Sequence, residues 1–155
     1  MEIEVWSDVA CPWCFLGKKR FEKALARFPH AADVTVRWRS YQLDPTMPKV
    51  YPGTSADMLV KKLGVGPQQL EAMHARMVGL GRAEGIEYRF DTVRPANTFD
   101  AHRLLQFGAA CGRSDQIHAA LFAAYFSEGK CLGEPGVLLD IGVAAGLDRA
   151  ETERV

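Results

Sequence analysis

The sequence has no excess of charge of either sign, because 19 lysines and arginines are matched by 19 aspartates and glutamates. A protein that binds nucleic acid or an anionic membrane surface usually carries a basic surplus or a basic patch. The densest basic run is Lys18-Lys19-Arg20, which a solvated helix face explains. We therefore expect neither a nucleic-acid partner nor a membrane partner.

The sequence also lacks a long hydrophobic run. No segment approaches the ~18 consecutive apolar residues that a membrane-spanning helix needs. The first residues run directly into a strand-like segment, without the positive charges and apolar core of a signal peptide. If Met1 is the natural start, these absences predict an intracellular, cytoplasmic protein.

Cysteine is scarce, with four in 155 residues, which is too few for the disulfide scaffold of a small secreted domain. In a reducing compartment, the close pair Cys11 and Cys14 is expected to be catalytic or metal-binding. A structural zinc site needs four ligands, but Cys111 and Cys131 have no near partners and the four histidines are scattered. We expect no metal site. Cys111 and Cys131 should be free thiols that turnover does not need, although a second disulfide or a resolving thiol is the alternative.

What the sequence does have is Cys11-Pro12-Trp13-Cys14, placed between a strand-like and a helix-like segment. Cys11 falls at the expected helix N-terminus, where free N–H groups and the helix dipole favour a thiolate. Pro12 suits the first helical position because it has no N–H to satisfy. Such motifs lower a thiol pKa from about 8.5 to roughly 3.5–7.5. The pattern predicts dithiol redox chemistry, with Cys11 more exposed and more acidic than Cys14.

Hydrophobic periodicity predicts an α/β chain. Residues 2–6 and 34–41 have strand patterns and residues 12–28 have a helical pattern, so the chain opens with a βαβ unit whose strands are parallel. A proline-rich connection follows, and the remaining sequence is nearly all helical. The expected helices are residues 55–64, 67–83, 97–110, 114–128 and 135–146.

Two details complete this prediction. Residues 86–90 should form a short extended piece, and one helix carries an apolar stripe that should be core. The stripe consists of Ile117, Leu121, Phe122, Tyr125 and Phe126. A βαβ unit followed by a helical block is typical of a thioredoxin-type fold with a helical insertion. We divide the chain into residues 1–45 (the βαβ half), 46–147 (the insertion) and 148–155 (the start of a final helix).

Several segments carry a resemblance to a known family: residues 7–18, residues 38–45 and residues 97–104. They resemble the DsbA-type thioredoxin-fold family, and are closest to its FrnE-like branch, which also includes glutathione-dependent 2-hydroxychromene-2-carboxylate isomerases. The resemblance covers essentially the whole chain and implies a DsbA-like fold. It also implies that Asn97 and His102 lie near the active cleft, where they could contact substrate or glutathione. A satisfied structural histidine is the alternative for His102.

The family's closing strands, final helix and cis-proline loop have no counterpart in this sequence. It ends roughly two turns into a helix that Asp148 should cap. We expect either a truncated chain or a sheet completed in another way. An open sheet edge invites pairing, and a missing wall would expose Trp6, Phe15 or Trp38. We therefore expect a homodimer through that edge or poor solubility.

The favoured function is thiol–disulfide oxidoreductase. Cys11 would form a mixed disulfide with a protein or small-molecule thiol and Cys14 would resolve it, with no dissociable cofactor required. Asp8 is either a turn residue or a carboxylate that relays protons to Cys14, and Trp13 either packs or contacts substrate. One alternative is an isomerase or transferase that uses glutathione as co-substrate, for which the resemblance implies no need of Cys14. The other is a non-catalytic binding module.

Overall fold

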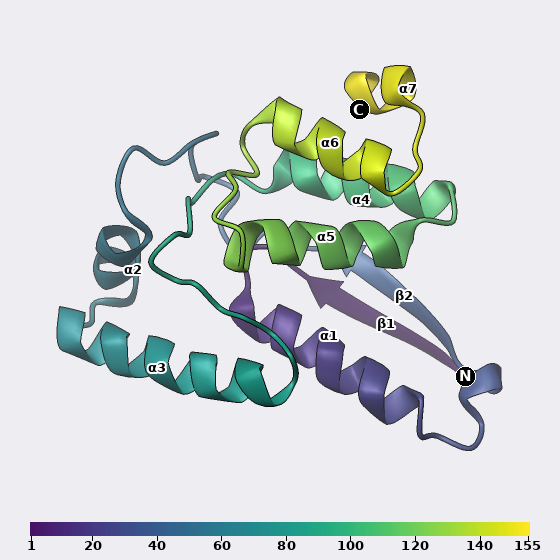
Figure 1. The fold of residues 1–155 in the computed structure, drawn as a ribbon, viewed down its shortest axis with the longest axis horizontal. Helices are drawn as coiled ribbons and strands as arrows, with labels where there is room; N and C mark the ends of the chain where they lie inside the picture. Colours follow the sequence, from purple (N-terminus) through teal and green to yellow (C-terminus); the bar gives the residue numbers. More distant parts are fainter.

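The structure, a computed structural model, describes all of residues 1–155. Two parallel strands and seven helices make up the chain (Figure 1). In chain order the elements are β1 (Glu2–Ser7), α1 (Pro12–Leu25), a 3-10 turn (Ala31–Asp33), β2 (Thr35–Ser40), α2 (Ser55–Leu63), α3 (Pro67–Ala83), α4 (Phe99–Ala110), α5 (Ser114–Phe126), α6 (Pro135–Ala144) and α7 (Arg149–Arg154). The predicted βαβ opening is confirmed, and Glu2 lies opposite Thr35 in its register.

Helix α1 begins where the sequence predicts and ends earlier. Cys11 is its N-cap and Pro12 its first residue. The expected end at residue 28 is wrong, because α1 stops at Leu25 and a turn follows. Phe28 precedes Pro29, and a residue before proline is disfavoured in helical conformation.

The two faces of the sheet differ in what covers them. On one face Trp38 packs edge-on against Phe21 of α1 (6.3 Å) and against His118 of α5 (5.0 Å). On the other face Arg37 pairs with Glu2 and Arg39 pairs with Glu4 across the strands. Both helices therefore cover one face, and the opposite face is charged.

Of the three aromatic residues expected to lose cover, only Trp6 is exposed, at 60%. Trp38 is half-buried. Phe15 is buried because it stacks on Phe122 of α5 at 4.8 Å between ring centroids. Helix α5 therefore covers the apolar side of α1 at Phe15.

The interpretation of the basic run as a solvated helix face is wrong for Lys18, whose side chain is 3% exposed. Its Nζ lies 2.6 Å from Glu22 and 3.1 Å from Asp115, and 4.6 Å from the centre of the Trp38 ring. These partners stabilise a charge that burial would otherwise penalise.

Helices α4, α5 and α6 pack on one another with α7 against α6, while α2 and α3 form a separate pair (Figure 1). All five residues of the predicted stripe on α5 are buried. One hydrophobic core joins them to Val9, Phe15 and Leu16 of the βαβ unit. The division into residues 1–45, 46–147 and 148–155 stays a prediction, because one core contains residues of both the βαβ half and the helical insertion.

The other helix limits agree within two residues, and Asp148 caps α7 by accepting the N–H of Glu151 at 2.9 Å. Residues 86–90 form no strand. None of the helices combines the length and apolar character needed to cross a bilayer.

Candidate active site

The two motif thiols meet at the N-terminus of α1. The backbone of Cys11 is extended (φ −96°, ψ 111°), and its Sγ accepts the N–H of Cys14 at 3.3 Å. Both residues are half-buried and all four cysteines of the chain are free thiols. The arrangement places the second sulfur one turn into the helix, beside the first.

The two thiols share a proton unequally. The Cys11 thiol donates to the Cys14 sulfur, and this hydrogen bond is the main reason why the pKa of Cys14 falls to about 6. The Asp8 N–H stabilises the same thiolate. The same bond and burial raise the pKa of Cys11, although the N–H groups of Cys14 and Trp13 act in the opposite direction.

The prediction that Cys11 is the more acidic thiol stays a prediction, because the hydrogen bond between the two sulfurs lets either of them hold the shared proton. The helix N-terminus acts on Cys11 as expected, through the N–H of Cys14. The Asp8 N–H, in the loop before the motif, acts on Cys14.

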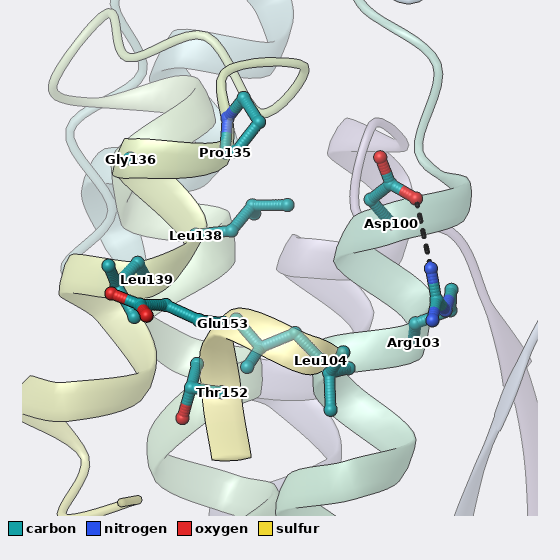
Figure 2. Close-up of a pocket in the computed structure, with 10 residues that line it drawn as sticks. Asp100, Arg103, Leu104, Pro135, Gly136, Leu138, Leu139, Thr152 and Glu153 are labelled. Carbon is teal, nitrogen blue, oxygen red and sulfur yellow. Dashed lines mark ion pairs between the residues drawn. The ribbon is translucent and has the colours of Figure 1, made fainter. Parts of the chain in front are cut away.

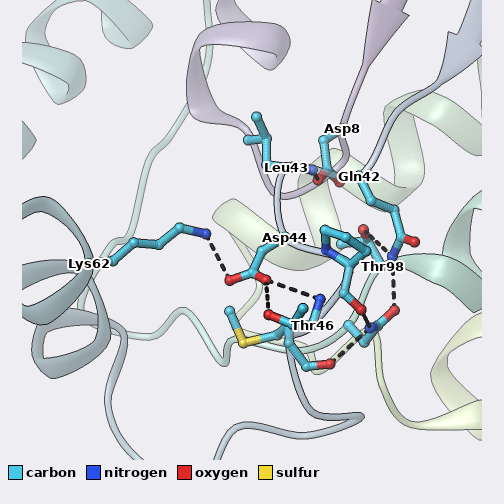
Figure 3. Close-up of polar contacts among 10 residues, drawn as sticks. Asp8, Gln42, Leu43, Asp44, Thr46, Lys62 and Thr98 are labelled. Atoms are coloured by element: carbon cyan, nitrogen blue, oxygen red, sulfur yellow. Dashed lines mark hydrogen bonds and ion pairs between the residues drawn. The ribbon is translucent and has the colours of Figure 1, made fainter.

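Asp8 is a buried carboxylate with three donors. Its Oδ1 accepts the Ala10 N–H (3.2 Å) and lies 3.2 Å from Nε2 of His102, and its Oδ2 accepts the Leu43 N–H (2.7 Å), as Figure 3 shows for the Leu43 side. Burial raises the pKa of Asp8, but the hydrogen bonds from His102, Leu43 and Ala10 outweigh it and the pKa is lowered. An ionised Asp8 thus ties the loop before Cys11 to the segment after β2 and to α4.

His102 and Asn97 have different surroundings, although the resemblance placed both near the cleft. His102 is 5% exposed, and its Nδ1 has no hydrogen-bond partner. Its contact with Asp8, 94 residues away in the chain, is the functional link that the sequence did not reveal. The position of Asp8 three residues before Cys11 made this carboxylate a candidate site residue. Nothing in that spacing predicts that His102 contacts Asp8.

The Asn97 amide is fully engaged within the protein. Its Nδ2 donates to the carbonyls of Pro45 (3.2 Å) and Met47 (2.8 Å), and its Oδ1 accepts from Gln42 and from the Phe99 N–H, both at 2.9 Å. Asn97 therefore fastens the loop after β2 to the start of α4. That arrangement gives Asn97 a structural role whether or not it also meets a ligand.

The same loop is also tied to α2. Asp44 accepts from the Thr46 hydroxyl (2.7 Å) and pairs with Lys62 of α2 at 2.9 Å (Figure 3). Lys62 and Thr46 together lower the pKa of Asp44 to about 2. The loop thereby holds α2 in place beside the thiol pair.

A cavity of about 400 Å³ opens beside Cys11. Cys11, Pro12 and Trp13 line it, and Cys14 does not. Helices α2 and α3 supply most of its opposite wall, including three methionines, Met58, Met73 and Met77. The Tyr88 hydroxyl donates to the Pro12 carbonyl at 2.6 Å, which fixes the first turn of α1 at the cavity's edge. Cys11 is thus the sulfur that an entering molecule would meet.

A second cavity of about 290 Å³ lies between α4, α6 and α7 (Figure 2). Asp100 and Arg103, 3.8 Å apart, stand on its α4 side. No cysteine lines this cavity, so its position does not link it to the thiol pair.

The two remaining cysteines lie apart from the motif. Cys111 is exposed at the end of α4, and Cys131 is fully buried. The structure contains no group of three or more histidine, cysteine, aspartate or glutamate side chains that could hold a metal ion.

Comparison with known proteins assigns the fold to a family. A model described as a DSBA-like thioredoxin domain matches residues 2–155. The chain belongs to the DSBA-like thioredoxin domain family. The resemblance to the DsbA-type family and the fold class expected from the sequence are thereby confirmed, and the assignment to the FrnE-like branch stays a prediction.

Individual relatives of this DSBA-like chain agree with that assignment. The uncharacterized protein YwbO of Bacillus subtilis (strain 168) is 26% identical over 151 residues, covering 97% of this chain and 68% of the relative. The crystal structure of a probable DsbA oxidoreductase from Streptomyces coelicolor is 38% identical, with a TM-score of 0.94 over 99% of this chain and 66% of that one.

A 2-hydroxychromene-2-carboxylate isomerase is similar in fold alone, with 17% identity and a TM-score of 0.62 over 99% of this chain and 70% of that one. The DSBA-like chain spans about two thirds of the length of these proteins.

Proposed function

We propose that this DSBA-like chain is a thiol–disulfide oxidoreductase that works through Cys11 and Cys14. The observation that carries the proposal is the pair itself: two free thiols that share a proton at the start of α1, one of which faces an apolar cavity. The pair holds one thiolate near neutral pH, because the hydrogen bond between the two sulfurs lowers the pKa of one of them, and the thiolate is the species that exchanges with disulfides.

The reaction follows from which sulfur is accessible. The shared proton passes from Cys11 to Cys14, and the Cys11 thiolate attacks one sulfur of a substrate disulfide. The substrate S–S bond breaks, and the departing thiolate takes a proton from water. Cys14 then loses its proton and attacks Cys11, so that the second substrate thiol leaves and the protein disulfide remains. In the reverse direction, a substrate dithiol reduces that disulfide, and no dissociable cofactor takes part.

Asp8 is suited to accept the Cys14 proton in the resolving step. Its charge already acts on Cys14, since the carboxylate opposes ionisation of that thiol. His102 holds the carboxylate in place, and is a positioning residue in this scheme. Trp13, 56% exposed at the cavity, is suited to contact substrate.

The partners in this proposal are protein or small-molecule thiols and disulfides. Glutathione could reduce the protein disulfide as a co-substrate. An isomerase that uses the glutathione thiolate would not need two protein thiols in contact, so the shared proton favours the redox function.

The test is trapping of the mixed disulfide. The Cys14→Ser variant, mixed with a substrate disulfide, should accumulate a covalent adduct at Cys11 that intact mass spectrometry detects, whereas the unaltered chain should release both substrate thiols. Absence of any adduct, together with no oxidation of the unaltered chain by glutathione disulfide, insulin or an aromatic disulfide, would refute the function.

A further inference from the structure

The cavity beside Cys11 has an uneven distribution of charge. No aspartate or glutamate lines it, and its two basic residues, His74 and Arg76, both belong to α3. The His74 ring stacks on Phe90 at 4.2 Å, and burial lowers the pKa of His74, which favours the neutral imidazole. Arg76 is exposed and pairs with no carboxylate in the structure. One unpaired positive charge therefore stands beside a mostly apolar cavity.

The apolar lining favours a particular kind of molecule. A volume of about 400 Å³ is in the range of small-molecule sites, roughly 300–1,000 Å³. Methionine sulfurs make favourable contacts with aromatic rings and adapt to their shape, and Met58, Met73 and Met77 all line this cavity. Few hydrogen-bonding side chains are present to replace the water around a polar peptide such as glutathione, and unreplaced water contacts oppose binding.

We propose that the cavity selects small aromatic disulfides and thiols that carry one acidic group per ring, with the sulfur at Cys11 and the acid at Arg76. This inference rests on the proposed function and adds the substrate class to it. The unpaired guanidinium supplies the charge complementarity, and the methionine-lined cavity holds the ring. Glutathione disulfide should react more slowly than its intrinsic reactivity predicts.

The probe reaction is oxidation of the reduced chain by dithiobis(nitrobenzoate), an aromatic disulfide with a carboxylate on each ring. The Cys11 thiolate attacks one sulfur and releases one nitrothiobenzoate, and Cys14 then displaces the second. One protein disulfide forms and two aryl thiolates leave, so atoms and electrons balance without another oxidant. Dithiodipyridine, a neutral aromatic disulfide, provides the comparison.

The decisive variant is Arg76→Gln, assayed with both disulfides. The rate constant with dithiobis(nitrobenzoate) should fall about two- to five-fold, as expected for loss of one partly exposed ion pair, and the rate with dithiodipyridine should not change. Arg82→Gln is the matched control, because Arg82 lies on the same helix outside the cavity. Equal effects on both disulfides, or an equal effect in the control, would overturn the inference.

A binding measurement separates this inference from the function on which it rests. Calorimetry with the Cys11→Ser/Cys14→Ser variant should show that naphthoate binds more tightly than neutral naphthylmethanol. Adding Arg76→Gln to this variant should abolish the difference in affinity. No preference for the acid would overturn the substrate class while leaving the redox function standing. If none of the disulfides oxidises the unaltered chain, the proposed function itself fails.

Discussion

The two sides of the thiol pair differ in kind. On the Cys14 side, Asp8 accepts three hydrogen bonds and is buried with His102. On the Cys11 side, α2 and α3 present a cavity lined by methionine and leucine side chains. The first side is polar, with its geometry set by directional hydrogen bonds. The second side is mostly apolar. In the proposed function, this difference corresponds to proton transfer at Cys14 and substrate contact at Cys11.

The sharpest test of this division is removal of each sulfur. Cys11→Ser should lower disulfide-exchange turnover by on the order of 1000-fold, because it removes the only thiol that the cavity reaches. Cys14→Ser should still form the first mixed disulfide and then stop. Stopped-flow release of the first substrate thiol distinguishes the two.

The matched control for these variants is Cys111→Ser combined with Cys131→Ala, which should turn over at nearly the unaltered rate. A Cys11→Ser protein that still forms an adduct rapidly through Cys14 would break the comparison, because the two sulfurs would then be equally accessible.

The polar side is tested by Asp8→Asn. We expect a loss of about 2 kcal/mol in the free energy of unfolding, because the amide cannot accept from all three donors. The pKa of Cys14 should fall below about 6, since the carboxylate that opposes its ionisation is gone. Denaturant unfolding and the thiolate ultraviolet absorbance measure the two effects.

Asp91→Asn is the control, because Asp91 is exposed and makes no ion pair or side-chain hydrogen bond in the structure. If Asp8→Asn raised the pKa of Cys14, the carboxylate would be acting on the thiol in some way other than through its charge.

Acid should act first on histidine side chains rather than on Asp8. His118 of α5 is fully buried against Phe122 and Trp38, and burial, followed by the charge of Lys18, lowers its pKa to about 3. The unfolded chain binds this proton near pH 6.5 and the folded chain does not. Stability is therefore full above about pH 6.5 and falls as the pH drops, by about 2 kcal/mol between about pH 7 and pH 5.

The lowered pKa of Asp8 has a different window. Its contribution is present above about pH 3.9, the unfolded value, and is lost only below it. Denaturant unfolding at several pH values should therefore show a slope between pH 7 and pH 5 that His118→Phe reduces and Asp8→Asn keeps, the remainder of the slope coming from the lowered pKa of His74. The exposed His30 provides a control as His30→Phe. An unchanged slope in His118→Phe would show that another group is responsible.

The smallest effect is expected on the apolar side. Met73→Ser, at a cavity residue that is 45% exposed, should raise KM for an aromatic disulfide about two- to five-fold with little change in kcat, since it removes apolar contact that does not change during the reaction. Steady-state kinetics measures both parameters.

Val143→Ser is the matched control on α6, at a residue that is 37% exposed and outside the cavity. A fall in kcat with KM unchanged for Met73→Ser would place that methionine in the chemistry rather than in recognition.

Local patterns predicted the parts of the site that are local in sequence. The Cys11-Pro12-Trp13-Cys14 motif, the parallel βαβ unit and the apolar stripe of α5 all follow from spacing and periodicity. The helix over residues 67–83 was predicted to the residue, because Pro67 marks its start. Family resemblance added the DsbA-like fold, which periodicity alone does not identify.

What the sequence could not provide were contacts between distant segments. The contact of Asp8 with His102 depends on how α4 docks, and the burial of Lys18 depends on Asp115 of α5. The cavity is formed by helices that are individually ordinary, so no single segment indicated it.

The long separation between Asp8 and His102 has a consequence for the order of folding. Nearby segments of a chain meet sooner than distant ones, because closing a longer loop costs more entropy. The thiols and the first turn of α1 can therefore form while α4 is still unplaced, since the bond from Cys14 to Cys11 spans three residues and that from His102 to Asp8 spans 94. During synthesis the two thiols would therefore emerge before the helices that line the cavity beside Cys11, and would for a time be exposed to oxidants without that cover.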